Sequence, residues 1–154
     1  MIVIGYQGIG KSTLSNKDLR FVDLESGNFW VDGKRADDWY KPYCQIANHL
    51  SEQGYAVFTS SHEVVRKELE NSKEKVFVVC PAPWLKDKWI EKLRNRYEST
   101  KLEKDFKALA NAEDRYTDNI IELMQSGFEF YCIEDMEYDL KDIINYLGEC
   151  ADVK

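Results

Sequence analysis

The stretch GYQGIGKST (residues 5–13) follows an apolar run, MIVI, at the start of the chain. Its first eight residues match the pattern G-x-x-x-x-G-K-[ST] without a mismatch. Glycines let the backbone fold so that successive N–H groups point at one anion, and a helix beginning near Lys11 adds its positive N-terminal end. The apolar strand pattern before it and the helix start after it are the context this mechanism needs. We therefore expect a phosphate-binding loop, here called the glycine loop.

Each position of the glycine loop has an expected role. Lys11 reaches the β and γ phosphates of a nucleotide, and the Ser12 hydroxyl is a ligand for Mg²⁺. A glycine-rich turn with an incidental lysine is the alternative interpretation, and the flanking strand and helix patterns disfavour it. The expected nucleotide-binding residues are Gly5, Gln7, Gly8, Ile9, Gly10, Lys11, Ser12 and Thr13.

The composition is that of one soluble globular domain. The 154 residues are 44% apolar and 32% charged, and there is no apolar run of about eighteen residues that would indicate a transmembrane helix. The apolar start lacks a basic leader, so we expect no signal peptide. The four cysteines are far apart and form no C-x-x-C pair. This argues against a metal site or a disulfide framework and favours a reducing cytoplasm.

Charge is unevenly distributed along the chain. The net charge is −7, which argues against general nucleic-acid binding. Residues 86–107 reverse this sign locally, because eight basic residues there outnumber five acidic ones. We expect this basic segment to meet any anion that long-range attraction brings to the protein.

Short strand patterns alternate with helical patterns. The strand patterns lie at residues 1–5, 20–25, 55–60, 75–80 and 129–134. Asp37 or Asp38 is expected to cap a helix that ends near Gly54, and Ser61 is expected to cap a shorter one. The remaining helical patterns lie at residues 85–97, 102–123 and 140–147. This alternation predicts a parallel sheet with helices on both faces, in one α/β domain over residues 1–154.

Four segments occur in the order found in a known family. They are the glycine loop, FVDLES (residues 21–26), VFTSSHEVVR (residues 57–66) and the basic segment. In this order residues 1–147 resemble the small P-loop kinases, which include nucleoside monophosphate, shikimate, gluconate and adenylylsulfate kinases. The chain is also similar to short kinase-like proteins encoded by bacteriophages. The resemblance implies a three-layer P-loop NTPase fold, a five-stranded parallel sheet in the order 2-3-1-4-5, an ATP donor, and a mobile helical lid over about residues 84–126.

The resemblance also implies where an acceptor binds. Asp23 ends the second strand, at the edge where α/β sheets bind ligands, and an acid there orients or deprotonates the acceptor hydroxyl or helps to hold Mg²⁺. Glu25 shares a face with Asp23 if the strand extends that far. Arg66 matches the place of an arginine that binds an acidic group of the acceptor. A strand-end turn and a solvated helix face are the alternative interpretations.

Serine and aromatic residues complete the expected acceptor region. The third strand ends in TSSH without the aspartate of a usual Walker B motif, which leaves Ser60, Ser61 or His62 to touch a substrate or a metal-bound water. Helix capping by Ser61 and a surface position for His62 are the simpler interpretations. Trp39 belongs to a dense group of aromatic residues that either stack a nucleobase or pack in the core.

Arg94 and Arg96 are the candidate lid residues. A guanidinium bridges the transferred and leaving oxygens with a two-pronged fork, which lysine lacks. At about 100° per residue, helical geometry places Arg96 and Lys92 on one flank of the apolar stripe and Arg94 on the other. A charged, solvated helix is the alternative.

Two functions from different classes follow from these residues. The first is an ATP-dependent phosphotransferase that moves the γ-phosphoryl group to a nucleotide, a nucleoside or a similar small acceptor, with Lys11, Asp23, Arg94 and Arg96 as catalytic residues and Ser12 and Asp23 at the metal. The alternative is a nucleotide-binding regulatory or sequestering protein. Only twelve residues lead from Lys11 to Asp23, which leaves about two helical turns, fewer than the resembling kinases use. A small NTPase is disfavoured by the missing Walker B acid. We expect no membrane partner and a cytoplasmic location.

Overall fold

Five strands form one parallel sheet in the computed structural model, which describes residues 1–152. The strands are β1 (Ile2–Gly5), β2 (Phe21–Asp23), β3 (Ala56–Thr59), β4 (Val76–Pro81) and β5 (Glu129–Ile133). They are hydrogen-bonded in the order β2-β3-β1-β4-β5, and every pair is parallel. The predicted α/β class, the strand number and the strand order are confirmed.

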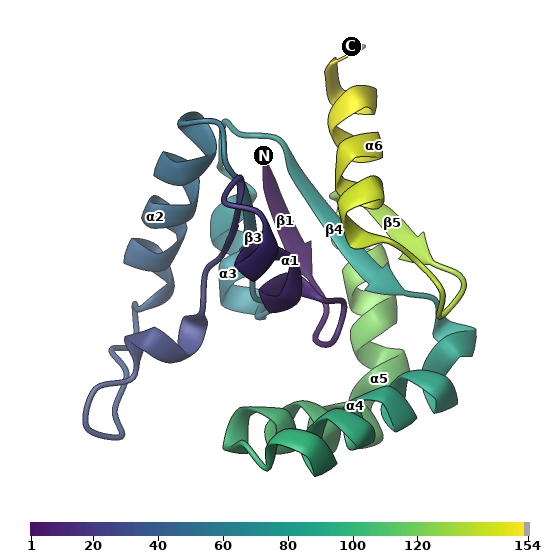
Figure 1. Ribbon diagram of the computed structural model, residues 1–154. Coiled ribbons are helices and arrows are strands. Elements are labelled where there is room, and N and C mark those ends of the chain that lie inside the picture. The colour runs from purple at the N-terminus through teal and green to yellow at the C-terminus, as the bar shows by residue number, and fades with distance from the viewer. Residues whose placement is uncertain (153–154) are drawn as a thin grey trace.

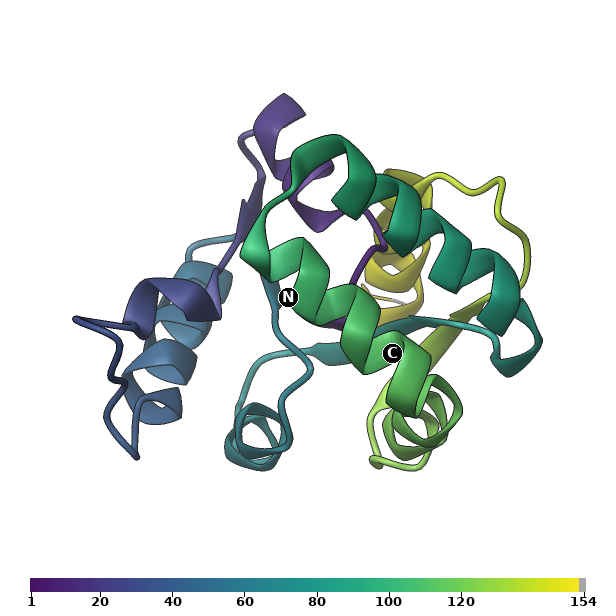
Figure 2. The ribbon, with the colours of Figure 1, turned by 90° about the horizontal axis from the view of Figure 1, so that it is seen from below.

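Helices cover both faces of the sheet, as Figures 1 and 2 show. One face carries α1 (Lys11–Lys17) and α6 (Leu140–Asp152). The other carries α2 (Tyr40–Glu52), α3 (Glu63–Leu69) and the second half of α5 (Glu103–Met124). The remaining elements are η1 (Ser26–Phe29), η2 (Pro83–Leu85) and α4 (Lys86–Thr100). None of the helices within residues 1–152 is both long enough and apolar enough to cross a membrane.

β1 is the central strand and carries the glycine loop at its carboxyl end. Its four residues are buried, because β3 and β4 flank it and helices cover both faces. β2 and β3 lie on one side of β1, and β4 and β5 lie on the other. Open α/β sheets bind ligands at the point where the chain changes from one side to the other in this way. The glycine loop therefore leaves the sheet at this switch point, beside the ends of β2 and β3.

A helical hairpin of α4 and α5 runs along the carboxyl ends of the strands (Figures 1 and 2). Its turn contains Lys101, which has a positive φ of 55°. The predicted apolar stripe of α4 is buried at Trp89 and Leu93. That of α5 is buried from Leu109 onward, whereas Leu102 and Phe106, which were predicted to belong to it, are about half exposed. α5 bends at Arg115, whose backbone is not helical, and the part beyond the bend packs on the sheet.

Two predicted helix starts are wrong. α2 begins at Tyr40 with Trp39 in the capping position, and neither Asp37 nor Asp38 caps it with a side chain. The buried Trp39 ring packs against Tyr43, so core packing sets this helix start. α3 begins after His62 without a side-chain cap, one residue later than a Ser61 cap requires. The last helix is also longer than predicted, reaching Asp152.

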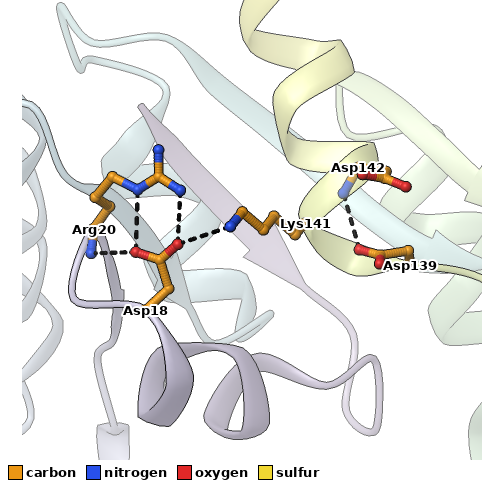
Figure 3. A network of polar contacts seen from close by, with 5 residues as sticks. All are labelled: Asp18, Arg20, Asp139, Lys141 and Asp142. Atoms are coloured by element: carbon orange, nitrogen blue, oxygen red, sulfur yellow. Dashed lines mark hydrogen bonds and ion pairs between the residues drawn. The ribbon is translucent and has the colours of Figure 1, made fainter.

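The short connection from α1 to β2 is closed by a charged network (Figure 3). α1 has seven residues, as the two predicted turns require, and Asp18 follows it in an extended conformation. The Asp18 carboxylate accepts hydrogen bonds from the Arg20 N–H (3.0 Å) and guanidinium (2.7 and 3.1 Å), and Lys141 of α6 lies 3.1 Å away. These donors hold the pKa of Asp18 well below its usual range. The carboxyl end of α1 is therefore linked to α6 through the contact of Asp18 with Lys141.

Candidate functional site

The glycine loop turns sharply between β1 and α1. Gly8 (φ 87°) and Gly10 (φ 107°) adopt left-handed backbone conformations that residues with a side chain rarely take. Gly8 also lies against α4, since a Cβ built on it would be 2.8 Å from Leu93 Cδ2 and 3.2 Å from Trp89 Nε1. Both the conformation and the close approach require glycine at this position.

Hydrogen bonds from other elements hold the carbonyl groups of the loop. The Trp89 indole donates to Gln7 O (2.9 Å), and the Tyr138 hydroxyl donates to Ile9 O (2.7 Å). The Gln7 side chain donates to Ala108 O (3.0 Å), which ties the loop to α5. On the donor side, the N–H groups of residues 10–13 make no hydrogen bond to any part of the chain that the structure describes. These donors are available to an anion.

Lys11 lies between acidic and basic neighbours. Its Nζ donates to Gly5 O (3.1 Å), so the side chain folds back over the loop. Burial lowers the pKa of Lys11, the charges of Asp23 and Glu25 raise it, and the charge of Arg96 lowers it further. The charges of β2 and α4 therefore both act on this ammonium group.

Two carboxyl groups face each other at the end of β2. Asp23 is the last residue of the strand, and burial raises the pKa of its carboxyl group. Lys11 opposes this increase, while the charge and a side-chain hydrogen bond of Glu25 add to it. Lys104 of α5 lies 3.9 Å from Glu25 Oε1, so the hairpin also contributes a cation. The predicted pair of acids is brought together with Lys11, and Lys104 is a neighbour that the sequence did not single out.

The oxygen set of this region fits a magnesium ion bound with a phosphate ligand. Among the side chains that the structure describes, no three of His, Cys, Asp or Glu gather as a metal site. Mg²⁺ does not need such a cage, because it binds through one or two carboxylates, water and substrate phosphates. The Asp23–Glu25 carboxyl pair supplies that kind of ligand, and the Ser12 hydroxyl makes no hydrogen bond to the described part of the chain.

The two candidate lid arginines lie on different flanks of α4, as helical geometry predicts. Arg96 Nε lies 3.1 Å from an oxygen of the buried Asp105, and the charge of Arg96 acts on Lys11. Arg94 instead pairs with Glu113 of α5 (3.5 Å), and both of these side chains are about half exposed. Lys92 shares the Arg96 flank, where its Nζ donates to the Tyr138 hydroxyl (2.8 Å). Of the two arginines, Arg96 is the one whose charge acts on Lys11.

Tyr43 links the carboxyl ends of β2 and β3. Its hydroxyl donates to Leu24 O (2.6 Å) and accepts from the Ser60 N–H (2.8 Å). The Ser60 hydroxyl is 2.8 Å from His62 Nδ1, so both groups are engaged beside the strand ends. The predicted substrate residue Ser60 is therefore linked through Tyr43 to Leu24, which lies between Asp23 and Glu25; no pattern in the sequence singled out Tyr43 for this position.

Trp39 and Arg66 have partners within the protein. Trp39 is buried, and the Arg35 guanidinium lies 3.8 Å from the centre of its ring. The Arg66 guanidinium donates to Ser61 O (3.1 Å) and lies 3.3 Å from Glu122 of α5. The Arg66 contacts join α3 to α5, and substrate binding by Arg66 stays a prediction. No pattern in the sequence predicted a role for Arg35, because its contact with Trp39 depends on how residues 30–39 fold.

Comparison with known proteins adds no relative. No family model matches the chain, and no protein in a curated collection matches it.

Proposed function

We propose that this protein transfers the γ-phosphoryl group of ATP to a small acceptor. The observation that carries the proposal is the meeting of Lys11, the unbonded N–H groups of the glycine loop and the Asp23–Glu25 pair at one sheet edge. Phosphoryl transfer needs little else from a protein, since positioning and charge stabilisation supply most of its catalysis. The sequence resemblance to small P-loop kinases supports the same function.

In this proposal the glycine loop and Lys11 bind the β and γ phosphates. Ser12 would hold a Mg²⁺ ion, which would supply charge neutralisation for the phosphates, and Asp23 is assigned to the acceptor hydroxyl. The acceptor oxygen bonds to the γ-phosphorus, the bond from that phosphorus to the bridging oxygen breaks, and ADP leaves.

The acceptor hydroxyl loses its proton in the same reaction. A base with a pKa raised toward neutrality removes a proton more effectively than an ordinary carboxylate. Burial raises the pKa of Asp23, so this carboxylate is the group that we assign to receive the proton. Arg96 approaches from α4 and stabilises the charge on the transferred group.

A nucleotide-binding protein without turnover is the second candidate. One observation favours it: β3 ends at Thr59 and is followed by Ser60, Ser61 and His62, without a carboxylate. Binding by the glycine loop does not depend on such a residue, whereas fast catalysis in many nucleotide enzymes does.

A coupled assay for ADP release separates the two candidates. It is run with ATP and Mg²⁺ over nucleosides, nucleoside monophosphates and small sugar acids, and calorimetry measures ATP binding in parallel. Acceptor-dependent ADP release supports the kinase. ATP binding without release under any condition supports the second candidate, and ADP release that needs no acceptor identifies a hydrolase and contradicts both.

A further inference from the structure

A histidine lies just beyond the end of β3, close to the glycine loop. The Nδ1 atom of His62 is 2.8 Å from the Ser60 hydroxyl, and the imidazole meets the Trp39 ring at an edge, with 5.4 Å between the ring centres. Burial lowers the pKa of His62, and the charges of Arg35 and Lys11 lower it further. The ordinary pKa of histidine is already about 6.5, so the His62 imidazole is neutral near pH 7.

The hydrogen bonds around Ser60 decide which ring nitrogen of His62 carries the proton. The Tyr43 hydroxyl donates to Leu24 O (2.6 Å), and it accepts from the backbone N–H and from the side chain of Ser60. A serine hydroxyl has a single proton, so the Ser60 oxygen accepts from His62 once that proton is donated to Tyr43. The network therefore assigns the proton to Nδ1 and the lone pair to Nε2. The Nε2 atom makes no hydrogen bond to the part of the chain that the structure describes.

His62 lies beside the start of the glycine loop. Gly5 and Ser60 come directly after the last paired residues of β1 and β3, so they leave the sheet side by side, about 5 Å apart. Lys11 Nζ is 3.1 Å from Gly5 O, and this ammonium group is the one proposed to bind the β and γ phosphates. The charge of Lys11 also acts on His62. A neutral nitrogen nucleophile thus stands near the terminal phosphate of the proposed complex.

We infer that His62 receives the γ-phosphoryl group of ATP, so that the protein phosphorylates its own histidine. The Nε2 lone pair forms a bond to the γ-phosphorus, the bond from that phosphorus to the bridging oxygen breaks, and ADP leaves with the electron pair. No proton has to move, because the ring keeps its Nδ1 proton and becomes a cation that carries the phosphoryl dianion. Self-phosphorylation rests on the ATP binding of the proposed function, but it needs no small acceptor.

The Ser60 hydroxyl is a poorer nucleophile in this arrangement. A serine hydroxyl needs a base to remove its proton as it attacks, whereas neutral imidazole does not. The Ser60 proton is donated to Tyr43, and the nitrogen next to Ser60 is the protonated Nδ1, which has no lone pair to act as that base. Phosphorylation of Ser60 is therefore the competing result that the experiment has to distinguish.

The second histidine of the chain is a matched control. The sequence contains two histidines, His49 and His62. His49 lies in the last turn of α2, where its Nε2 is 3.1 Å from Gln53 Nε2, and α2 ends just before β3 begins. His49 is therefore at the opposite edge of the sheet from Ser60. The variants are His62→Asn, His49→Asn and Ser60→Ala, and circular dichroism and calorimetric ATP affinity verify that each one is folded and binds ATP.

Labelling of the full chain tests the inference. The protein is incubated with Mg²⁺ and ATP radiolabelled in the γ position, without an acceptor, and is quenched in alkali, because phosphohistidine is stable to alkali and labile to acid. We expect acid-labile label in the wild type, background label in His62→Asn, a change below about 2-fold in His49→Asn, and labelling of His62 that is about 10-fold slower in Ser60→Ala, which loses the partner of Nδ1. Tandem mass spectrometry of an alkaline digest locates the phosphoryl group.

Three results overturn the inference: label that survives in His62→Asn, acid-stable label that disappears in Ser60→Ala, or no label on a wild type that binds ATP. The ADP-release assay keeps the two proposals apart. Labelling of His62 without acceptor-dependent release contradicts transfer to a small acceptor and leaves self-phosphorylation standing, and acceptor-dependent release from an unlabelled protein does the reverse. Self-phosphorylation releases a single ADP per chain, which distinguishes it from the continuous release of a hydrolase.

Discussion

Substitution of Gly8 by alanine tests the packing of the α4–α5 hairpin on the glycine loop. Two costs are expected. The left-handed backbone at φ 87° is unfavourable for alanine by about 1–2 kcal/mol. The new Cβ would lie 2.8 Å from Leu93 Cδ2 and 3.2 Å from Trp89 Nε1, and overpacking of this kind costs about 1–3 kcal/mol. Gly8→Ala should therefore lower the free energy of unfolding by about 2–5 kcal/mol.

The cost of overpacking against Leu93 and Trp89 is hard to avoid, because neither side chain can move away from the new Cβ. Leu93 is 2% exposed and Trp89 is fully buried, so neither side chain has open space to enter. Trp89 also donates its indole N–H to Gln7 O at 2.9 Å, and a shift of α4 would stretch that bond. The substitution should therefore weaken ATP binding together with stability, since the loop and α4 move as neighbours.

Two other glycines separate the two costs. Gly33→Ala meets no atom within 4 Å but has a φ of 74°, so it measures the backbone cost alone. Gly27→Ala has neither problem and should be close to neutral. Urea denaturation with a constant m-value gives the three free-energy changes. If Gly8→Ala lowers the free energy of unfolding no more than Gly33→Ala does, close packing of α4 against Gly8 is contradicted.

Three further predictions concern the charged residues. Lys11→Met should weaken ATP binding by at least about 10-fold in calorimetry, because a charge-assisted phosphate contact is lost, whereas Lys17→Met, at an exposed position of the same helix, should not. Arg96→Gln should lower kcat of the proposed transfer by about 10²-fold, while Arg94→Gln, which removes a half-exposed ion pair, should leave it unchanged; equal effects in the ADP-release assay would contradict the assignment. The pKa of Asp18 is lower in the folded state, so its stabilising effect is present above about pH 4 and is lost as the pH falls below that value. Melting curves from pH 7 to pH 3 should show the advantage of the wild type over Asp18→Asn shrinking only at the acidic end.

Much of the architecture follows from local sequence patterns. Apolar runs buried on both faces mark β1 and β4, and apolar stripes mark the helical hairpin. These patterns are reliable because burial of one face is a property of each element by itself. The helix starts at Tyr40 and Glu63 were not predictable in this way, because no side-chain cap specifies either one and packing does.

The candidate site likewise contains some residues that the sequence located and others that depend on tertiary packing. The glycine loop could be located from sequence because a contiguous pattern of glycines, lysine and serine defines its backbone and chemistry. Its neighbours could not be chosen from sequence. Arg94 and Arg96 are equivalent candidates until the hairpin packs on the loop, and then Asp105 and Lys11 distinguish Arg96.

The parallel α/β sheet and the position of the glycine loop between β1 and α1 thus follow from patterns in the sequence, and the strand order was expected from the family resemblance. Which side chains from distant elements lie beside the loop and the acidic pair depends on the packing of the elements: Trp89 lies against Gly8, and Lys104 lies beside Glu25. This difference arises because periodicity and turn chemistry act over a few neighbouring residues. The meeting of side chains from different elements depends instead on how the whole set of helices packs on the sheet.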